Sequence, residues 1–258
     1  MHLMKRILSA AAVLALSASL LVGCSSGTAS SVPVSASSAA ESTVSSVEET
    51  ASSAVDENEA AAAQLLNDLT GSYQELWPVI LADEYKQTWL DDCTALVGEE
   101  NAEAAFEKLS SMVTSDVYGE DAVEAYANGG GAYFCGFTNS LATLTFDGET
   151  STISGTDKDG NVLFSHTYHY IGMEPVRGLY EFQSDDADSG EFTYFFLAPD
   201  TSAETYHIEF RYGSDADALS QYDAGDYAYW LASGISTDCD QTMIDNCIEL
   251  FCTENLAG

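Results

Sequence analysis

The feature that most limits the possible folds is a series of six short runs rich in β-branched and aromatic residues between positions 141 and 213. The runs are LATLTF, TSTIS, NVLFSHTYHYI, RGLYEFQ, EFTYFFLA and TYHIEFRYG. Turn sequences separate them, for example at residues 146–148 and 157–160. Because strands joined by short turns pair antiparallel, this succession predicts an antiparallel meander that closes, or nearly closes, into a barrel.

Helical patterns flank the β-rich part on both sides. Before it, apolar residues recur with helical spacing, and the pattern is broken near Pro78. After it, helical patterns return up to the C-terminus. The predicted helical segments are residues 57–69, 71–96, 101–116, 215–223, 227–232 and 240–251. We therefore predict a mainly β domain, an antiparallel barrel with helices packed at its N- and C-terminal ends.

The first residues predict export and lipidation. A basic pair precedes an apolar run, residues 7–22, which is too short for a spanning helix and ends in small residues before a cysteine. This pattern is that of a bacterial lipobox. We predict that residues 1–23 are a lipoprotein signal peptide and that Cys24 is lipidated, which anchors the protein at the outer face of the bacterial cell membrane. An ordinary signal peptide that happens to carry a cysteine is the alternative.

The next segment differs in composition from the rest of the chain. Residues 25–60 are mostly Ser, Ala, Thr, Val and Glu, with no aromatic residue and no Lys or Arg. Such a segment cannot bury enough apolar surface to offset its ordering entropy. We predict a disordered tether over residues 24–60, followed by one barrel domain at residues 61–258 that is long enough to bury a sizeable core.

The charge balance excludes some partners. The chain has 7 Lys and Arg against 42 Asp and Glu, and its formal net charge is -35. Such a surface repels phosphate backbones and anionic lipid headgroups, so we expect no nucleic-acid partner and no membrane contact besides the acyl anchor. The same charge keeps proteins soluble, and we expect a monomer.

Cysteine usage leaves the disulfide pairing open. Of six cysteines, Cys24 is assigned to the lipid, which leaves Cys93, Cys135, Cys239, Cys247 and Cys252. Because five is odd, at most two disulfides form and at least one thiol stays free. The last two cysteines lie in a helical pattern, where buried free thiols are expected. A zinc–thiolate site is the alternative there.

As a strand, the run at residues 204–213 would have one apolar face and, on its opposite side, one polar face. The apolar members are Tyr206, Ile208, Phe210 and Tyr212, and the polar members are Thr205, His207, Glu209 and Arg211. The polar row has two interpretations. It is either a solvated face, in which Arg211 ion-pairs with Glu209, or part of a metal site.

Four segments of the chain, in order over most of residues 66–235, resemble one known family. They are LTGSYQELWPVI, VRGLYEF, TYHIEFRYG and YAYWL. The chain is similar in these segments to the ZinT (YodA-like) family of extracytoplasmic zinc-binding proteins. The resemblance implies a calycin-like, lipocalin-related barrel that binds zinc and sometimes cadmium. It also implies an accessory role in handing zinc to an ABC importer or to its binding protein.

The resemblance implies a His-x-His pair of metal ligands just before an Arg-Tyr-Gly-like turn. Alignment through residues 211–213 places His207 and Glu209 on that pair, whereas alignment through the His-Ile dipeptide places Thr205 and His207 on it. A further family histidine should fall within residues 193–200, and none is present. The resemblance therefore supports the fold better than the metal.

Two other histidines are candidate replacements for the missing family ligands. His166 shares the more apolar face of its run and is expected to point into the barrel toward His207, whereas His169 lies on the other face and is a reserve ligand. Two histidines and Glu209 with an open water position would form an acceptable zinc geometry. Taken singly, each histidine is also compatible with an ordinary hydrogen-bonded position in the core or at the rim.

Calcium binding, catalysis and binding of a small organic ligand are the other functions to compare with zinc binding. The acidic segments 184–191 and 213–219 lack the calcium-loop spacing and are interpreted as acidic turns. No catalytic motif is present, so we expect no enzyme activity. A barrel lined by some of the 14 Tyr, 11 Phe and 3 Trp and enclosing a small apolar or sugar ligand is the alternative function. That alternative gains if the three histidines diverge in space.

Overall fold

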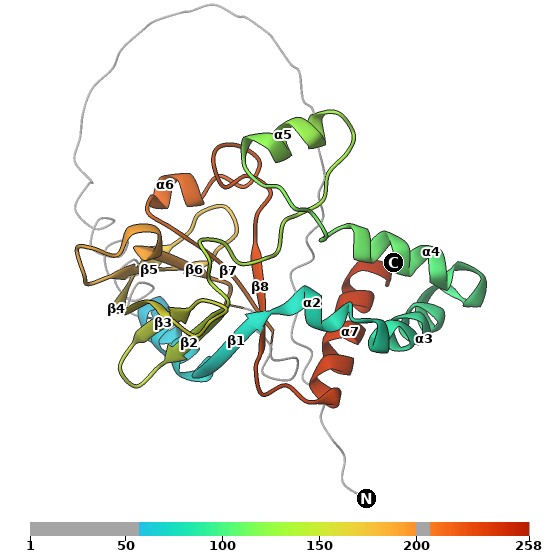
Figure 1. The fold of residues 1–258 in the computed structure, drawn as a ribbon, viewed down its shortest axis with the longest axis horizontal. Coiled ribbons are helices and arrows are strands. Elements are labelled where there is room, and N and C mark those ends of the chain that lie inside the picture. Colours follow the sequence, from blue (N-terminus) through green and yellow to red (C-terminus); the bar gives the residue numbers. More distant parts are fainter. Residues whose placement is uncertain (1–56, 200–206, 258) are drawn as a thin grey trace, which may run out of the picture. The chain divides into compact units, whose positions relative to one another are not determined.

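The structure, a computed structural model, describes residues 57–199 and 207–257. Within them, eight strands form a closed antiparallel barrel in which sequence neighbours pair and β8 pairs with β1 (Figure 1). The strands are β1 Gly71–Glu75, β2 Thr143–Asp147, β3 Thr152–Thr156, β4 Val162–Met173, β5 Tyr180–Ser184, β6 Tyr194–Leu197, β7 His207–Gly213 and β8 Ala232–Ser236. The predicted antiparallel barrel with added helices is confirmed. The predicted signal peptide, Cys24, the predicted tether up to residue 56, Thr205 and Tyr206 lie outside the described residues.

The sequence missed the two strands that close the barrel. β1 occupies the first five residues of the predicted helix 71–96. The predicted helix 227–232 is wrong: its residues form turns and a bridge, and its last residue begins β8. Tyr73 shows why β1 forms: it pairs with Leu144 on one side and Ser236 on the other, and its ring meets Phe146 edge-on at 5.7 Å. These partners are distant in sequence, so no local pattern in β1 reveals them.

The inside of the barrel is filled by stacked aromatic rings. Phe164 stacks on Phe192 with ring centroids 4.0 Å apart, and Phe195 stacks on Tyr212 at 5.3 Å. The helix over residues 57–68 packs into the same core through Ala62, Leu65 and Leu66, and Leu69, directly after it, joins them. Its first four described residues belong to the segment predicted as tether. The interior is therefore a packed aromatic core.

A glycine fixes how that helix meets the barrel. Gly148, in the turn between β2 and β3, lies so close to the helix that an added Cβ would be 2.4 Å from the Cα of Asn67 and 2.6 Å from the carbonyl oxygen of Leu66. Its amide also donates to the Thr70 hydroxyl at 3.1 Å. Only a residue without a side chain allows this approach.

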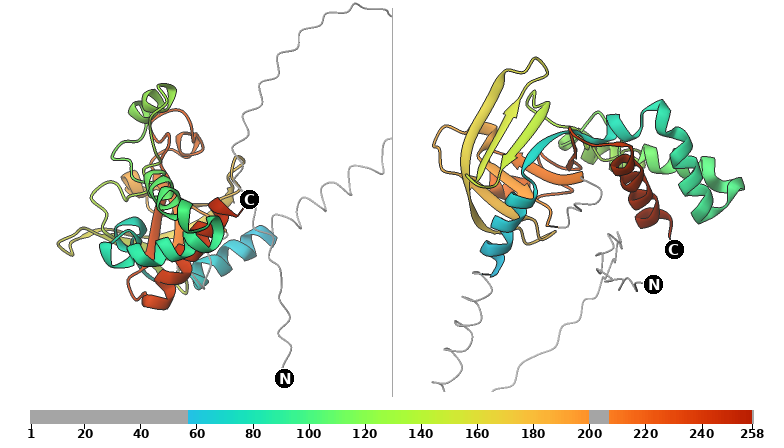
Figure 2. Two further views of the ribbon diagram at one scale, coloured as in Figure 1. Left: turned by 90° about the vertical axis from the view of Figure 1, so that its right-hand side faces the viewer. Right: turned by 90° about the horizontal axis from the view of Figure 1, so that it is seen from below.

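A second layer of helices packs beside the barrel (Figures 1 and 2). It consists of α2 Leu76–Ile80, the 3-10 turn η1 Asp83–Tyr85, α3 Lys86–Val97, α4 Glu99–Ser111 and α7 Gln241–Leu256. These helices share a second core that includes Trp77, Trp89 and Ile248 and reaches the barrel wall at Ile235 of β8. Asp240 caps α7 by accepting from the Met243 amide at 3.0 Å.

Three short elements lie in the connections: α5 Glu120–Ala127, η2 Gly190–Phe192 and α6 Ala216–Leu219. The sequence predicted α6 but not α5. No helix in the described part of the chain is both long and apolar enough to cross a membrane.

Candidate functional site

The alternation of β4 places two histidines on opposite sides of the barrel wall. Phe164, His166 and Tyr168 point inward, and the His166 side chain is 17% exposed. His169 points outward and is 53% exposed. The inward orientation of His166 agrees with the expectation from its apolar face.

Two consecutive aspartates pair with these two histidines. Asp186 Oδ2 lies 2.7 Å from Nδ1 of His166, and Asp185 Oδ1 lies 2.6 Å from Nδ1 of His169. The register explains the arrangement: Ser184 pairs with Tyr168 at the end of β5, so the next residues continue beside β4. The Asp185 amide donates to the Thr167 carbonyl at 2.9 Å and holds this turn against β4.

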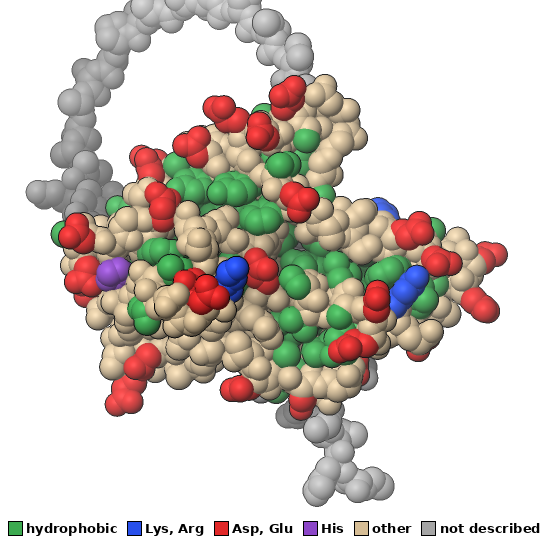
Figure 3. Space-filling view, viewed as in Figure 1, with side chains coloured by type: hydrophobic (Ala, Val, Ile, Leu, Met, Phe, Trp, Pro, Cys, Tyr) green, Lys and Arg blue, Asp and Glu red, His purple; other side chains and the backbone are tan. Residues whose placement is uncertain are grey.

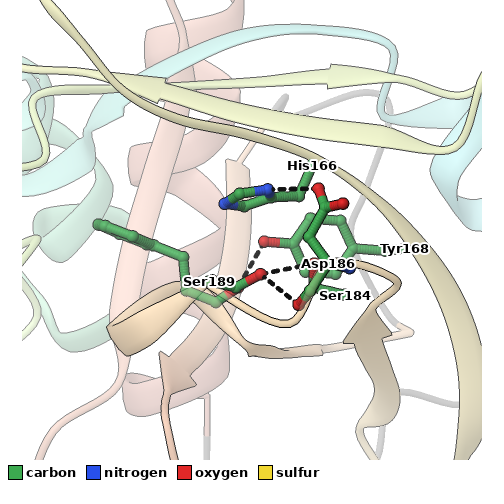
Figure 4. Close-up of polar contacts among 6 residues, drawn as sticks. His166, Tyr168, Ser184, Asp186 and Ser189 are labelled. Carbon is green, nitrogen blue, oxygen red and sulfur yellow. Dashed lines mark hydrogen bonds and ion pairs between the residues drawn. The ribbon is translucent and has the colours of Figure 1, made fainter.

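The inner pair is supported by a small hydrogen-bonded turn (Figure 4). The Asp186 amide donates to the Ser184 hydroxyl at 3.1 Å, and the Ser189 hydroxyl lies 2.7 Å from the Ser184 hydroxyl and 3.0 Å from the Asp186 carbonyl oxygen, within hydrogen-bond distance of both. The two serines are buried. These contacts fix the backbone that carries the Asp186 carboxylate.

Two aromatic residues of the same strand, Phe164 and Tyr168, also hold the His166 ring in place. The ring stacks on Phe164 at 5.9 Å and meets Tyr168 edge-on at 6.4 Å. The Tyr168 hydroxyl donates to the Phe192 carbonyl at 2.5 Å, and burial, with the nearby Asp186 charge, raises the pKa of Tyr168. Tyr168 therefore acts as a neutral hydrogen-bond donor that positions the ring.

The chemistry of the His166–Asp186 pair follows from which nitrogen is bonded. A carboxylate on Nδ1 favours the tautomer with its proton there, which leaves the lone pair on Nε2. This arrangement suits an imidazole that binds a metal ion or accepts a proton. A carboxylate that orients a ligating histidine is a common feature around protein-bound zinc.

His207 and Glu209 lie on the outer face of β7. They pair with Ile235 and Ser233 of β8, whereas Ile208, which lies between them, belongs to the barrel core. Glu209 is half-buried, and it lies near the thiols of Cys135 and Cys247, which belong to the helical core beside the barrel. Burial raises the pKa of Cys135 to about 12 and that of Cys247 to about 12, and the Glu209 charge contributes to both shifts.

Arg211 does not form the exposed pair that the solvated-face interpretation required. Its side chain is fully buried and donates to the carbonyls of Leu219, Gln221 and Tyr227, which belong to the segment that covers this part of β7. Its guanidinium also lies 4.4 Å from the ring centroid of Tyr222. Arg211 therefore attaches residues 219–227 to the barrel, and that interpretation is wrong for this residue.

The four predicted ligands are not brought together. β5 and β6 separate β4 from β7, and His166 lies inside the wall whereas His207, Glu209 and His169 lie outside it. Among residues 57–199 and 207–257, no three His, Cys, Asp or Glu side chains form a group that could hold a metal ion. The predicted set therefore does not fit a single ion in this arrangement.

The structure adds two residues that the sequence did not single out. Asp185 and Asp186 belong to segment 184–191, which was interpreted as an acidic turn. This segment directly follows β5, which pairs with the histidine-bearing strand β4. The sequence could have indicated the two aspartates only if the β4–β5 register had been known. Of the two histidine–aspartate pairs, His166–Asp186 has the more buried imidazole.

A group of half-buried aromatic residues lies near α5. Tyr126 stacks on Tyr229 with centroids 3.7 Å apart, Tyr133 meets Tyr229 edge-on at 5.7 Å, and Tyr118 stacks on Phe134 at 5.4 Å. Figure 3 shows hydrophobic side chains exposed between α5 and α6. This aromatic group is a candidate surface for an apolar or sugar ligand.

Comparison with known proteins gives only distant similarities. No family model matches the chain, and no curated protein matches it significantly. The Zn(II)-bound ZinT-like domain of Streptococcus pneumoniae AdcA is similar over 71% of this chain and 89% of that domain, with 15% identity and a TM-score of 0.45.

Zn(II)-bound AdcA from Streptococcus pneumoniae is similar over 72% of this chain, with 14% identity and a TM-score of 0.42. The match spans 35% of the AdcA chain. With TM-scores below 0.5, neither similarity bears on the site, whose chemistry rests on the residues of this chain.

Proposed function

We propose that this protein is a lipid-anchored extracytoplasmic protein whose barrel domain binds a divalent metal ion, with zinc as the first candidate and cadmium as the second. His166 is the proposed main ligand. The observation that carries the proposal is the 2.7 Å contact between its Nδ1 and the Asp186 carboxylate, which presents Nε2 as a metal ligand. The sequence resemblance to zinc-binding proteins supports the choice of metal.

A site with few protein ligands has a consequence for the role. Zinc accepts imidazole nitrogen and carboxylate oxygen, and water fills positions that the protein leaves open. Such a site binds more weakly than a closed structural zinc site and exchanges its ion readily. This suits a monomeric protein that hands zinc to an ABC importer or its binding protein, which is the partner we propose.

The other predicted ligands are assigned to separate positions. His169 with Asp185 forms a second carboxylate–imidazole pair on the outer face of β4. His207 and Glu209 lie on the outer face of β7. We propose them as weaker positions that do not share an ion with His166.

Calorimetric titration of zinc at moderate salt tests this assignment. We expect a one-to-one transition in the wild-type protein that disappears in His166→Ala and persists in His169→Ala, the matched control on the same strand. His207→Ala should keep the transition too. If all four proteins give the same weak, multi-site isotherm, zinc binds only to the acidic surface and the proposal fails.

The anchor has its own test. Replacing Cys24 by Ala should move the protein from the membrane fraction to the soluble extracytoplasmic fraction, because the acyl chains are the proposed membrane contact. Membrane association of the Cys24→Ala protein would contradict the lipoprotein assignment without affecting the metal assignment.

A second candidate function is binding of a small apolar or sugar ligand without metal. Two observations favour it: the predicted ligand histidines diverge, and the aromatic group around Tyr126, Tyr133 and Tyr229 is half-buried rather than fully enclosed. Quenching of intrinsic fluorescence by added sugars, lost in Tyr229→Ala, would support this candidate. Quenching that is unchanged in Tyr229→Ala would count against it.

A further inference from the structure

We propose that Cys93 and Cys252 form a disulfide bond in the exported protein, which joins α3 to α7. The two Sγ atoms lie 3.9 Å apart, and both side chains are completely buried in the helical core. The bond would connect two residues separated by 159 positions in sequence. It requires an oxidising compartment and so rests on the proposed export.

The position of the pair supports a covalent link. A disulfide has an S–S length of about 2.05 Å, so the sulfurs must approach by roughly 1.9 Å, which needs only a modest adjustment of two facing side chains. The other thiols are placed differently. Cys135 lies against Ser233 and Trp77 at the barrel wall, and Cys239 is half-buried before α7 begins.

The interface between α3 and α7 also carries like charges. Asp92, next to Cys93, has its pKa raised by burial and by the nearby carboxylates of Glu249 and Asp245 on α7. These acids repel one another across the interface that the two cysteines share. A covalent bond at this position would hold the helices together against that repulsion.

Formation of the bond requires a two-electron oxidant. The two thiols lose two protons and two electrons, which pass to the disulfide of an oxidase protein or of a small thiol, which is reduced to two thiols. Exchange proceeds through a mixed disulfide between one cysteine and the oxidant. Attack by the second cysteine then releases the reduced oxidant and leaves the Cys93–Cys252 bond.

Both thiols are fully buried once the helices are packed, so we expect the bond to form before packing is complete. Burial raises the pKa of both Cys93 and Cys252, and the charge of Asp92 contributes to both shifts. Because the thiolate is the attacking species, the folded reduced protein reacts slowly. Oxidant present during refolding should therefore produce the bond much faster than oxidant added afterwards.

Peptide mapping of the full chain tests the proposal directly. The protein is isolated from the surface of the producing cells, denatured without reductant, alkylated and digested. We expect one cross-linked peptide pair containing Cys93 and Cys252, lighter by two hydrogens than the separate peptides. The same pair should appear when reduced protein is refolded with oxidised and reduced glutathione. Cys247→Ala, on the same helix α7, should keep it.

Thermal unfolding supplies a second readout. Reduction should lower the melting temperature of the wild-type protein by at least ~5 °C, because the bond restricts a long loop of the unfolded chain. The melting temperature of Cys252→Ala should not respond to reductant. Alkylation of both cysteines in the exported protein would overturn the proposal, as would their failure to pair during glutathione refolding or pairing with other cysteines.

Discussion

The carboxylate of Asp186 lies 2.7 Å from Nδ1 of His166 on the inner side of β4, and the preceding residue, Asp185, makes the corresponding contact with His169 on the outer side. One strand therefore carries two carboxylate–imidazole pairs that differ in burial. The inner imidazole is 17% exposed and the outer one 53% exposed. This difference provides a matched comparison within a single protein.

Replacing each aspartate by asparagine should separate the two pairs. Asp186→Asn keeps the shape of the side chain but removes the charge that orients and activates His166, so we expect zinc affinity to fall about 10- to 100-fold. Asp185→Asn should leave the main transition unchanged. Zinc calorimetry of both variants at one pH provides the measurement, and equal losses in the two would contradict a site at His166.

Asp92 predicts how stability depends on pH. Its folded-state pKa is raised, by burial and then by the carboxylates of Glu249 and Asp245, so the folded state holds this proton more tightly than the unfolded state does. Its contribution to the free energy of unfolding therefore falls as pH rises from its ordinary value, about 3.9, toward the raised one. At neutral pH the ionised Asp92 side chain therefore lowers the free energy of unfolding.

We accordingly expect Asp92→Asn to be more stable than the wild-type protein at pH 7. The difference should shrink as pH is lowered through about 4 toward about 3, where the wild-type carboxyl becomes protonated in both states. Urea unfolding at several pH values would measure it. A gain that stays constant down to pH ~3 would show that protonation of Asp92 is not its cause.

The contact of Gly148 with the helix over residues 57–68 predicts a large effect for a small substitution. In Gly148→Ala the new methyl group would meet backbone atoms of Asn67 and Leu66, which cannot move aside without shifting the helix. We expect a loss of about 2–3 kcal/mol in the free energy of unfolding.

The matched control is Gly160→Ala, where φ is +81° and an added Cβ meets nothing within 4 Å. That variant should lose only about 1–2 kcal/mol, from the left-handed backbone alone. Denaturant unfolding compares the two. Equal losses of unfolding free energy in the two variants would contradict the close packing of the helix over residues 57–68 against Gly148.

The sequence predicted the six successive strands from β2 to β7 and missed β1 and β8, which close the barrel. β4, with 12 residues, has a periodicity that identifies both the strand and the inward side of His166. β1 has five residues, and its Tyr73 is held by partners on β2 and β8 that no local pattern reveals.

The candidate site was predictable only in part for the same reason. His166 was found from its own strand, but its partner Asp186 depends on the β4–β5 register. The outer face of β7 was misjudged at Arg211 because residues 219–227 cover it, and that coverage is set by tertiary packing. A polar row in one strand does not indicate what lies over it.

Arg211 gives the last prediction, because a single guanidinium satisfies carbonyls of Leu219, Gln221 and Tyr227 at once. The ammonium of Arg211→Lys is a compact donor and cannot reach all of them, nor can it stack on Tyr222. Buried carbonyls would be left without donors, so we expect a loss of about 2–4 kcal/mol in the free energy of unfolding. Urea unfolding provides this measurement.

The matched control is Arg177→Lys, since Arg177 is half-buried, donates to the Tyr133 hydroxyl at 3.1 Å and lies 4.3 Å from the same Tyr222 ring. That variant should lose only about 1 kcal/mol. Limited proteolysis within residues 219–227 should become faster in Arg211→Lys alone, because those residues lose their attachment to β7. Zinc binding at His166 should be unchanged in both variants, since Arg211 lies on the other side of the barrel wall. Equal stability losses with unchanged proteolysis would show that Arg211 does not hold this segment.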